Sequence, residues 1–172
     1  MIYYRVLFSI TIFLMYSFFG TGQEESNSAF ENEVGFRIRV ASNVNWTDTR
    51  LDVIEGQRIH FKASGGISLQ QGNPIAYCGP DGYNLKTVQQ PISDKNIGAL
   101  IGKVVQLLSI EVDEETGEEI RNEHFELFYL GSENDVMIPL SGRLFLGINE
   151  IVVGDNAGEF EVLVFFNRDL TR

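Results

Sequence analysis

Two segments of the chain alternate apolar and polar residues with the period of two that a half-buried β-strand requires. In residues 35–41, "GFRIRVA", the apolar positions are Phe36, Ile38 and Val40, and arginines lie between them. Residues 57–63, "QRIHFKA", repeat this pattern with basic side chains or histidine on the outer face. A Glu-Gly pair, typical of a turn, precedes the second segment. We therefore expect two strands that form a hairpin with each other.

The middle of the chain follows no regular pattern. Residues 65–98 are rich in Gly, Pro, Asn and Gln, which favour turns, and a loop of this length in a compact domain is usually functional or disordered. Residues 99–112 are apolar enough to predict a strand buried on both faces. The acidic stretch 111–124 then predicts a solvated hairpin that turns at Thr116 and Gly117, with a cation-binding acidic patch as the alternative.

Further apolar segments, separated by turn residues, complete the chain. The last of them, residues 158–167, places every second side chain from Phe160 to Phe166 on one face. No stretch of ten or more residues after the N-terminal leader has a helical period. Short strands between turn signals predict an all-β fold, a β-sandwich that forms a single domain over residues 35–172.

The N-terminus has the pattern of a cleavable secretory signal peptide over residues 1–22. One charge at Arg5 precedes an apolar run, and small residues follow it. The run from Val6 to Phe19 is shorter than the roughly 20 residues of a membrane-spanning helix, so an uncleaved anchor is the less favoured alternative. Residues 23–34 are polar and acidic, and we expect a flexible lead-in. The protein is therefore expected to be secreted or periplasmic, with no membrane segment in its mature form.

The charge balance narrows the classes of partner. The chain has 13 basic and 24 acidic residues, a net charge of −11, and removal of Arg5 with the leader makes it one unit more negative. Nucleic acids and anionic membranes attract clustered Lys and Arg, so neither is an expected partner. A chain with this negative charge attracts divalent cations instead. Cys78 is the only cysteine, which excludes an internal disulfide.

The sequence contains no recognisable catalytic constellation. The motifs G-x-S-x-G and H-E-x-x-H are absent, and the two histidines, His60 on the outer face of a strand and His124 beside the acidic stretch, have no nucleophile near them in sequence. Paired carboxylates alone can hydrolyse glycosides, so that chemistry stays open. The favoured interpretation is a protein that is not an enzyme.

A loop between the last two strands concentrates oxygen-bearing side chains. Asn149, Glu150, Asp155 and Asn156 lie within eight residues, and glycine follows closely. Such residues make turns. They are also the carboxylate and amide oxygens that Ca²⁺ takes as ligands, together with backbone carbonyls. The residues alone leave a plain turn and a calcium loop as alternatives.

Five segments follow one another along the chain: "VASNVNWTDTRLDVIEGQRIHFKASGG" (40–66), "GPDG" (79–82), "ALIGKV" (99–104), "FYLGSENDVMIP" (128–139) and "GRLFLGINEIVVGDNAGEFEV" (142–162). In this order they resemble the PA-IL-like calcium-dependent galactose-binding lectin family. The resemblance covers nearly all of residues 36–166. It implies a jelly-roll-like β-sandwich with calcium between two loops at one end, completed by two sugar hydroxyls.

The resemblance also assigns residues to the site. The side-chain ligands of calcium would be Glu150, Asp155 and Asn156, joined by backbone carbonyls near Val153 and Leu69. The same three side chains would contact a galactoside or related glycan. Further sugar contacts would come from the loop after "GPDG", which offers Tyr83, Asn84, Lys86 and Gln89.

Two departures from the family pattern leave an alternative open. Glu150 replaces an aspartate of the family and is one methylene longer, and residues 151–153 are apolar where a cation loop is usually polar. The alternative is a non-catalytic structural or protein-interaction sandwich that has lost its calcium and uses residues 151–153 as a contact surface. The stretch 111–124 resembles an insertion, and Trp46 is expected to pack over the edge of the sandwich rather than stack on a sugar. Assembly into a homo-oligomer is left open.

Overall fold

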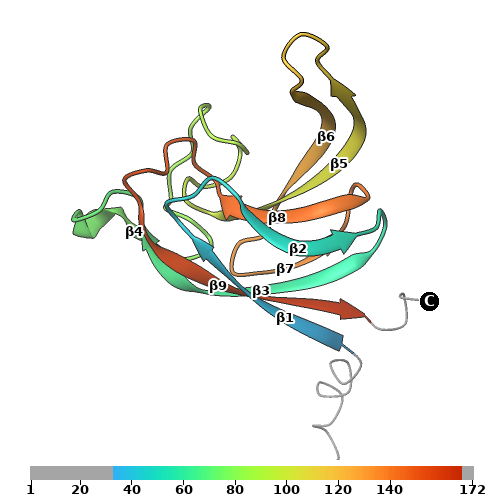
Figure 1. The fold of residues 1–172 in the computed structure, drawn as a ribbon. Helices are drawn as coiled ribbons and strands as arrows, with labels where there is room; N and C mark the ends of the chain where they lie inside the picture. The colour runs from blue at the N-terminus through green and yellow to red at the C-terminus, as the bar shows by residue number, and fades with distance from the viewer. Residues whose placement is uncertain (1–32, 168–172) are drawn as a thin grey trace, which may run out of the picture. The chain divides into compact units, whose positions relative to one another are not determined.

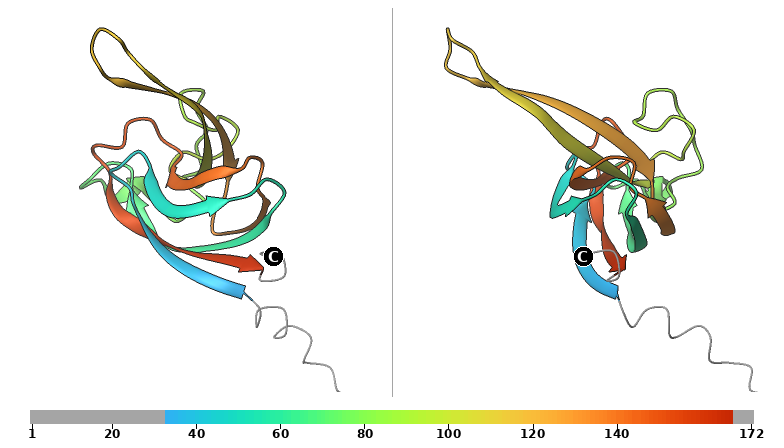
Figure 2. Two further views of the ribbon diagram at one scale, coloured as in Figure 1. Left: turned by 45° about the vertical axis from the view of Figure 1, so that its right-hand side comes forward. Right: turned by 90° about the vertical axis from the view of Figure 1, so that its right-hand side faces the viewer.

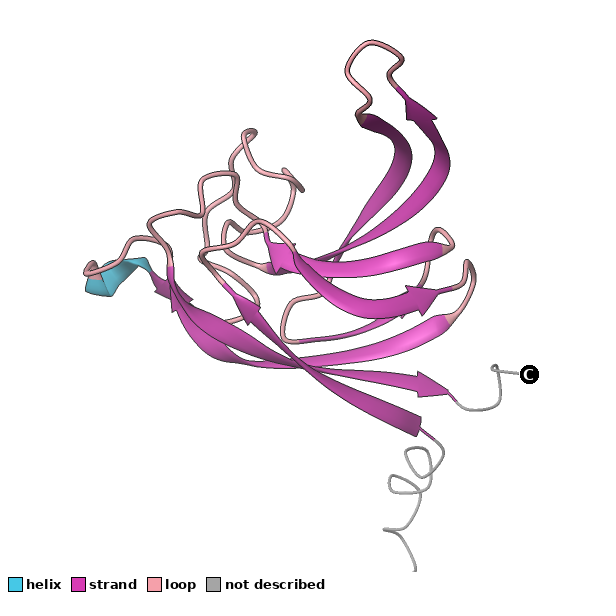
Figure 3. Cartoon of the chain, in the orientation of Figure 1, coloured by secondary structure: helices cyan, strands magenta, loops and turns pink. Residues whose placement is uncertain are grey.

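The computed structural model describes residues 33–167, which form nine β-strands and one short 3-10 helix (Figure 1). Figure 3 shows how strongly strands and loops dominate this part of the chain. The elements are β1 (Glu33–Ala41), β2 (Thr47–Val53), β3 (Arg58–Ser68), η1 (Pro74–Ala76), β4 (Tyr77–Cys78), β5 (Leu100–Val112), β6 (Glu119–Tyr129), β7 (Glu133–Met137), β8 (Gly142–Ile148) and β9 (Ala157–Asn167). The predicted all-β fold is confirmed.

The first sheet has the order β1-β9-β3-β4, and β7 also pairs with β3. β9 is antiparallel to both of its neighbours, with Val162 opposite Ile38 on one side and Val164 opposite Phe61 on the other. The predicted hairpin between β1 and β3 is wrong, because the last strand of the chain lies between them. The expected turn at Gly56, which has a φ of 79°, connects β2 to β3 and so crosses from one sheet to the other.

The second sheet has the order β2-β8-β5-β6 and is also antiparallel throughout. Its edge strand β2 is irregular, since the register with β8 shifts between Asp48 and Asp52 and Arg50 adopts a φ of 61°. An irregular, charged edge resists pairing with another chain. The Thr49 hydroxyl bridges the irregularity by donating a hydrogen bond of 2.7 Å to the Leu144 carbonyl.

The two sheets enclose one apolar core, as a β-sandwich requires. The first sheet contributes the face of β9 that the sequence predicts, and Phe160 and Val164 are completely buried there. Leu144 and Leu146 of β8 are buried from the other side. Further core side chains come from β3, β5 and the loop before β7, namely Ile59, Phe61, Leu100, Val104 and Leu130. The strands therefore meet face to face through the positions that alternation predicts.

β5 and β6 continue well beyond the sandwich as a projecting hairpin (Figure 2). β5 was expected to be buried on both faces, and this is wrong for its second half. It loses β8 as a neighbour after the pair Val105–Arg143, and from Leu107 onward its side chains are exposed. The predicted turn at Thr116 and Gly117 is confirmed, with Gly117 at a φ of 72°.

The leader, residues 1–22, and nearly all of the lead-in, residues 23–34, lie outside the described residues, so the predicted signal peptide stays a prediction. Within residues 33–167, no helix is long and apolar enough to cross a membrane. The long middle segment, residues 65–98, is mostly loop, as expected, and its regular elements are the end of β3 up to Ser68, η1 and β4.

Candidate functional site

The loop between β8 and β9 carries the oxygen-rich residues, and the first of them has a structural role. Asn149 is completely buried, and its side chain is saturated by the neighbouring loop. Its Oδ1 accepts a hydrogen bond of 2.8 Å from the Ile92 N–H, while its Nδ2 donates to the carbonyls of Ile92 and Asn96, both at 3.0 Å. Asn149 therefore fastens residues 92–96 to the end of β8.

Glu150 and Asn156 approach each other across the same loop. The Asn156 Nδ2 donates to Glu150 Oε2 at 2.6 Å and to the Ser42 carbonyl at 3.2 Å. Asn156 is almost completely buried, and its Oδ1 has no hydrogen-bond partner among the described residues. A buried amide oxygen without a donor is costly, which makes it a natural ligand for a cation.

Ser42 holds the far side of Asn156 in place, and sequence reasoning did not identify it. It is completely buried, and both its N–H and its hydroxyl donate to the Gly158 carbonyl, at 3.0 and 2.9 Å. Its own carbonyl receives the Asn156 amide. In the sequence, Ser42 looks like any serine that follows a strand. Only the fold reveals this role.

Asp155 and Leu69 belong to two loops that lie side by side. The Gln71 N–H donates to the Asp155 carbonyl at 2.8 Å, which joins the loop after β3 to the loop before β9. Glu150, Asp155 and Leu69 line one hollow of about 350 Å³. The structure thus brings together three of the five residues that were expected around calcium, from two distant parts of the sequence.

The electrostatics of this hollow favour a cation. Burial raises the pKa of Glu150, and the nearby Asp155 carboxylate raises it further, whereas the hydrogen bond from Asn156 acts in the opposite direction. None of the ion pairs among residues 33–167 includes either carboxylate. Two like charges that face one hollow without a basic partner repel each other, and a divalent ion between them would remove this repulsion.

The donor set fits calcium better than a softer metal. No group of three His, Cys, Asp or Glu side chains that could hold a metal gathers in residues 33–167, so an ion in the hollow would have two carboxylates at most and would need amide and carbonyl oxygens besides. The oxygens of Glu150, Asp155 and Asn156, with carbonyls of Leu69 and Val153, are hard ligands of the kind that Ca²⁺ accepts. The Val153 carbonyl already accepts a hydrogen bond of 3.1 Å from the Asn156 N–H, and a carbonyl has a second lone pair.

The loop after the "GPDG" turn forms the other side of the hollow. The turn is closed by a hydrogen bond of 3.0 Å from the Gly82 N–H to the Gly79 carbonyl, and the Asp81 carboxylate accepts from the Ser132 N–H at 2.8 Å. Tyr83 and Leu85 line the hollow directly. Lys86 and Gln89, the predicted sugar contacts, are exposed and lie outside this lining.

The two histidines lie away from the hollow, whereas the Cys78 thiol is near enough to Glu150, which lines the hollow, to interact with that carboxylate. His60 lies on the outer face of β3 as expected, but it is not an ordinary exposed histidine, because its side chain is only 16% exposed between Glu133 at 3.4 Å and Asp135 at 3.1 Å. His124 lies on the projecting hairpin. Burial raises the pKa of the Cys78 thiol to about 11, so it is protonated at neutral pH.

Comparison with known proteins relates this chain to solved structures alone. No family model matches it, and no curated protein does. One matching structure is the N-terminal domain of EclA, described as a PllA-like lectin, with 21% sequence identity and a TM-score of 0.50. The match covers 79% of this chain and 98% of that one. The two share a fold.

Proposed function

We propose that this protein is an exported, non-enzymatic lectin that binds galactosides or related glycans through calcium. The observation that carries the proposal is the hollow lined by both Glu150 and Asp155, behind which Asn156 is bonded to Glu150 and keeps a buried amide oxygen without a hydrogen-bond partner among the described residues. The fold that the chain shares with a PllA-like lectin domain supports a carbohydrate as the kind of partner. The resemblance of the loop sequences to calcium-dependent lectins supports the same proposal.

Calcium would supply a partly dehydrated cation to which two neighbouring sugar hydroxyls bind directly. Glu150, Asp155 and Asn156 would hold the ion, together with the carbonyls of Leu69 and Val153. That set leaves room among the six to eight positions of calcium for two hydroxyl oxygens. Ser42 and Asn149 position the loop from both of its ends.

The test is a glycan array probed with the full chain in millimolar calcium and again in chelator. Calcium-dependent retention of galactosides supports the proposal, and retention that chelator leaves unchanged contradicts it. Asp155→Ala removes one ligand carboxylate and is expected to weaken calcium binding by about 100-fold, measured by calorimetry. Glu114→Ala, which removes the same charge from the exposed hairpin, is the matched control and should bind as the parent does.

A second candidate function rests on the apolar side of the same loop. Ile151 and Val152 are 61% and 70% exposed, as a contact surface for another protein requires, although Val153 is buried. In this alternative the sandwich is an interaction module without calcium. An unfolding midpoint that is equal in calcium and in chelator would favour it over the lectin.

A further inference from the structure

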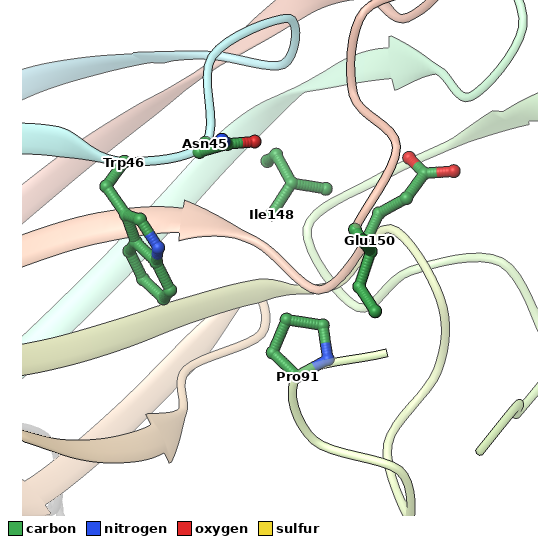
Figure 4. A pocket seen from close by; sticks show the side chains of 6 residues that line it. Asn45, Trp46, Pro91, Ile148 and Glu150 are labelled. Atoms are coloured by element: carbon green, nitrogen blue, oxygen red, sulfur yellow. The ribbon is translucent and has the colours of Figure 1, made fainter. Parts of the chain in front are cut away.

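A second hollow, of about 220 Å³, shares Glu150 with the candidate calcium site. Figure 4 shows Trp46 on one side of it and Pro91 and Glu150 on the other, with Ile148 between Trp46 and Glu150. Ile151 and Asn45 complete the lining. In the same view the Glu150 carboxylate points away from Trp46, so the stem of this side chain forms the wall of the second hollow.

The indole of Trp46 is held in place by the sheet beneath it. The Lys103 ammonium lies 4.3 Å from the centre of the ring, a cation–π contact. Gly147 of β8 gives the ring its space, because a Cβ at that position would lie 2.8 Å from an indole carbon. A ring fixed from two sides loses little freedom when a ligand stacks on it.

The lining of the hollow fits a sugar ring. Trp46, Pro91, two isoleucines and the stem of Glu150 offer apolar surface, whereas the Asn45 amide lies at the border and the Glu150 carboxylate lies beyond the wall. A pyranose has one face of C–H groups and a rim of hydroxyls, and it therefore matches a site that is apolar in the middle and polar at a few points. A wholly apolar ligand would offer no hydrogen-bond partner to the Asn45 amide.

Glu150 lines both hollows, so they adjoin at this residue, and a ligand longer than one sugar ring could reach from one to the other. We propose that the protein recognises an oligosaccharide rather than a single sugar, with a second ring stacked on Trp46 while the first ring is held at calcium. This inference rests on the proposed lectin function. It assigns to Trp46, Pro91 and Ile151 the selection of the second ring and of the linkage between the rings.

Trp46 is the only tryptophan in the chain, so its fluorescence reports on this hollow without any mutation. The experiment titrates the full chain, loaded with calcium, with methyl galactoside and with galactosyl disaccharides that differ in linkage. At least one disaccharide is expected to bind about tenfold more tightly than the monosaccharide and to shift the Trp46 emission. Disaccharides that bind no better than the monosaccharide, with an unchanged emission, would overturn the inference.

Two variants test whether Trp46 provides the higher affinity for the disaccharide. Trp46→Ala is expected to remove the advantage of the disaccharide, and Phe36→Ala, which truncates an exposed aromatic side chain on β1, is the matched control that keeps it. An advantage that persists in Trp46→Ala contradicts the inference even if the lectin function holds. Absence of calcium-dependent binding of any galactoside instead contradicts the proposed function, and the inference with it.

Discussion

Glu150 is a partly buried carboxylate beside a second carboxylate, and this environment has a measurable cost. Because burial and Asp155 raise its pKa, the folded protein retains the proton to a higher pH than the unfolded chain does. Without calcium, the stability linked to Glu150 is therefore fully present below the ordinary glutamate pKa and is lost as the pH rises through the raised value. The charged form is tolerated best when a cation neutralises it.

Glu150→Gln removes this titration while it keeps the shape of the side chain. In chelator at pH 7 we expect the variant to unfold a few degrees above the parent, with little difference below about pH 4, where the parent is protonated. In calcium the order reverses, because only the parent binds the ion. Thermal unfolding at both pH values checks this, with the exposed Glu118→Gln as control. A variant that is less stable than the parent in chelator at pH 7 would contradict the account.

Sequence reasoning found part of the site at the scale of single residues. Glu150, Asp155 and Asn156 stood out because oxygen-bearing side chains are rare between two apolar strands. The roles of Ser42 and Asn149 could not be found in this way, since each depends on a hydrogen bond to a segment more than fifty residues away. Such contacts exist only once the chain has folded.

At the scale of elements, the alternation of residues predicted where strands lie but not how they pair. Every strand of an antiparallel sandwich has the same period, so the pattern of β1 fits β3 as a neighbour as well as it fits β9. The exposed half of β5 is a related case. Its apolar residues have the pattern of a buried strand. The structure shows that β8 begins at Gly142, so the second half of β5 extends past it and its side chains are exposed.

The hairpin beyond the sandwich should be dispensable for the fold. From the pair Leu107–Glu123 onward, β5 and β6 pair only with each other. Replacement of residues 107–123 by Asn-Gly joins Gln106 to His124, which already face each other, through a two-residue turn suited to that geometry. We expect an unfolding midpoint within a few degrees of the parent and unchanged calcium binding, measured by thermal unfolding and calorimetry. A clearly lower unfolding midpoint, or weaker calcium binding, would show that the hairpin supports the fold or the site.

At the scale of the whole domain, stability depends on the core between the sheets, since the chain has one cysteine and therefore no disulfide. Phe160 is completely buried in that core. Phe160→Ala is expected to lower the free energy of unfolding by about 3–5 kcal/mol in urea titrations. Phe125→Ala, which truncates a side chain that is 55% exposed, should cost less than about 1 kcal/mol. Equal losses in the two variants would mean that the core lies elsewhere.

The central place of β9 in the first sheet has a consequence for how the chain is made. β1 and β3 are synthesised early, yet the strand that joins them consists of residues 157–167. Until that segment has left the ribosome, the edges of β1 and β3 that pair with β9 stay unpaired. The contacts that close the sheet are among the most distant in sequence. This sheet therefore cannot close before residues 157–167 have been synthesised, and until then its open edges are accessible to chaperones.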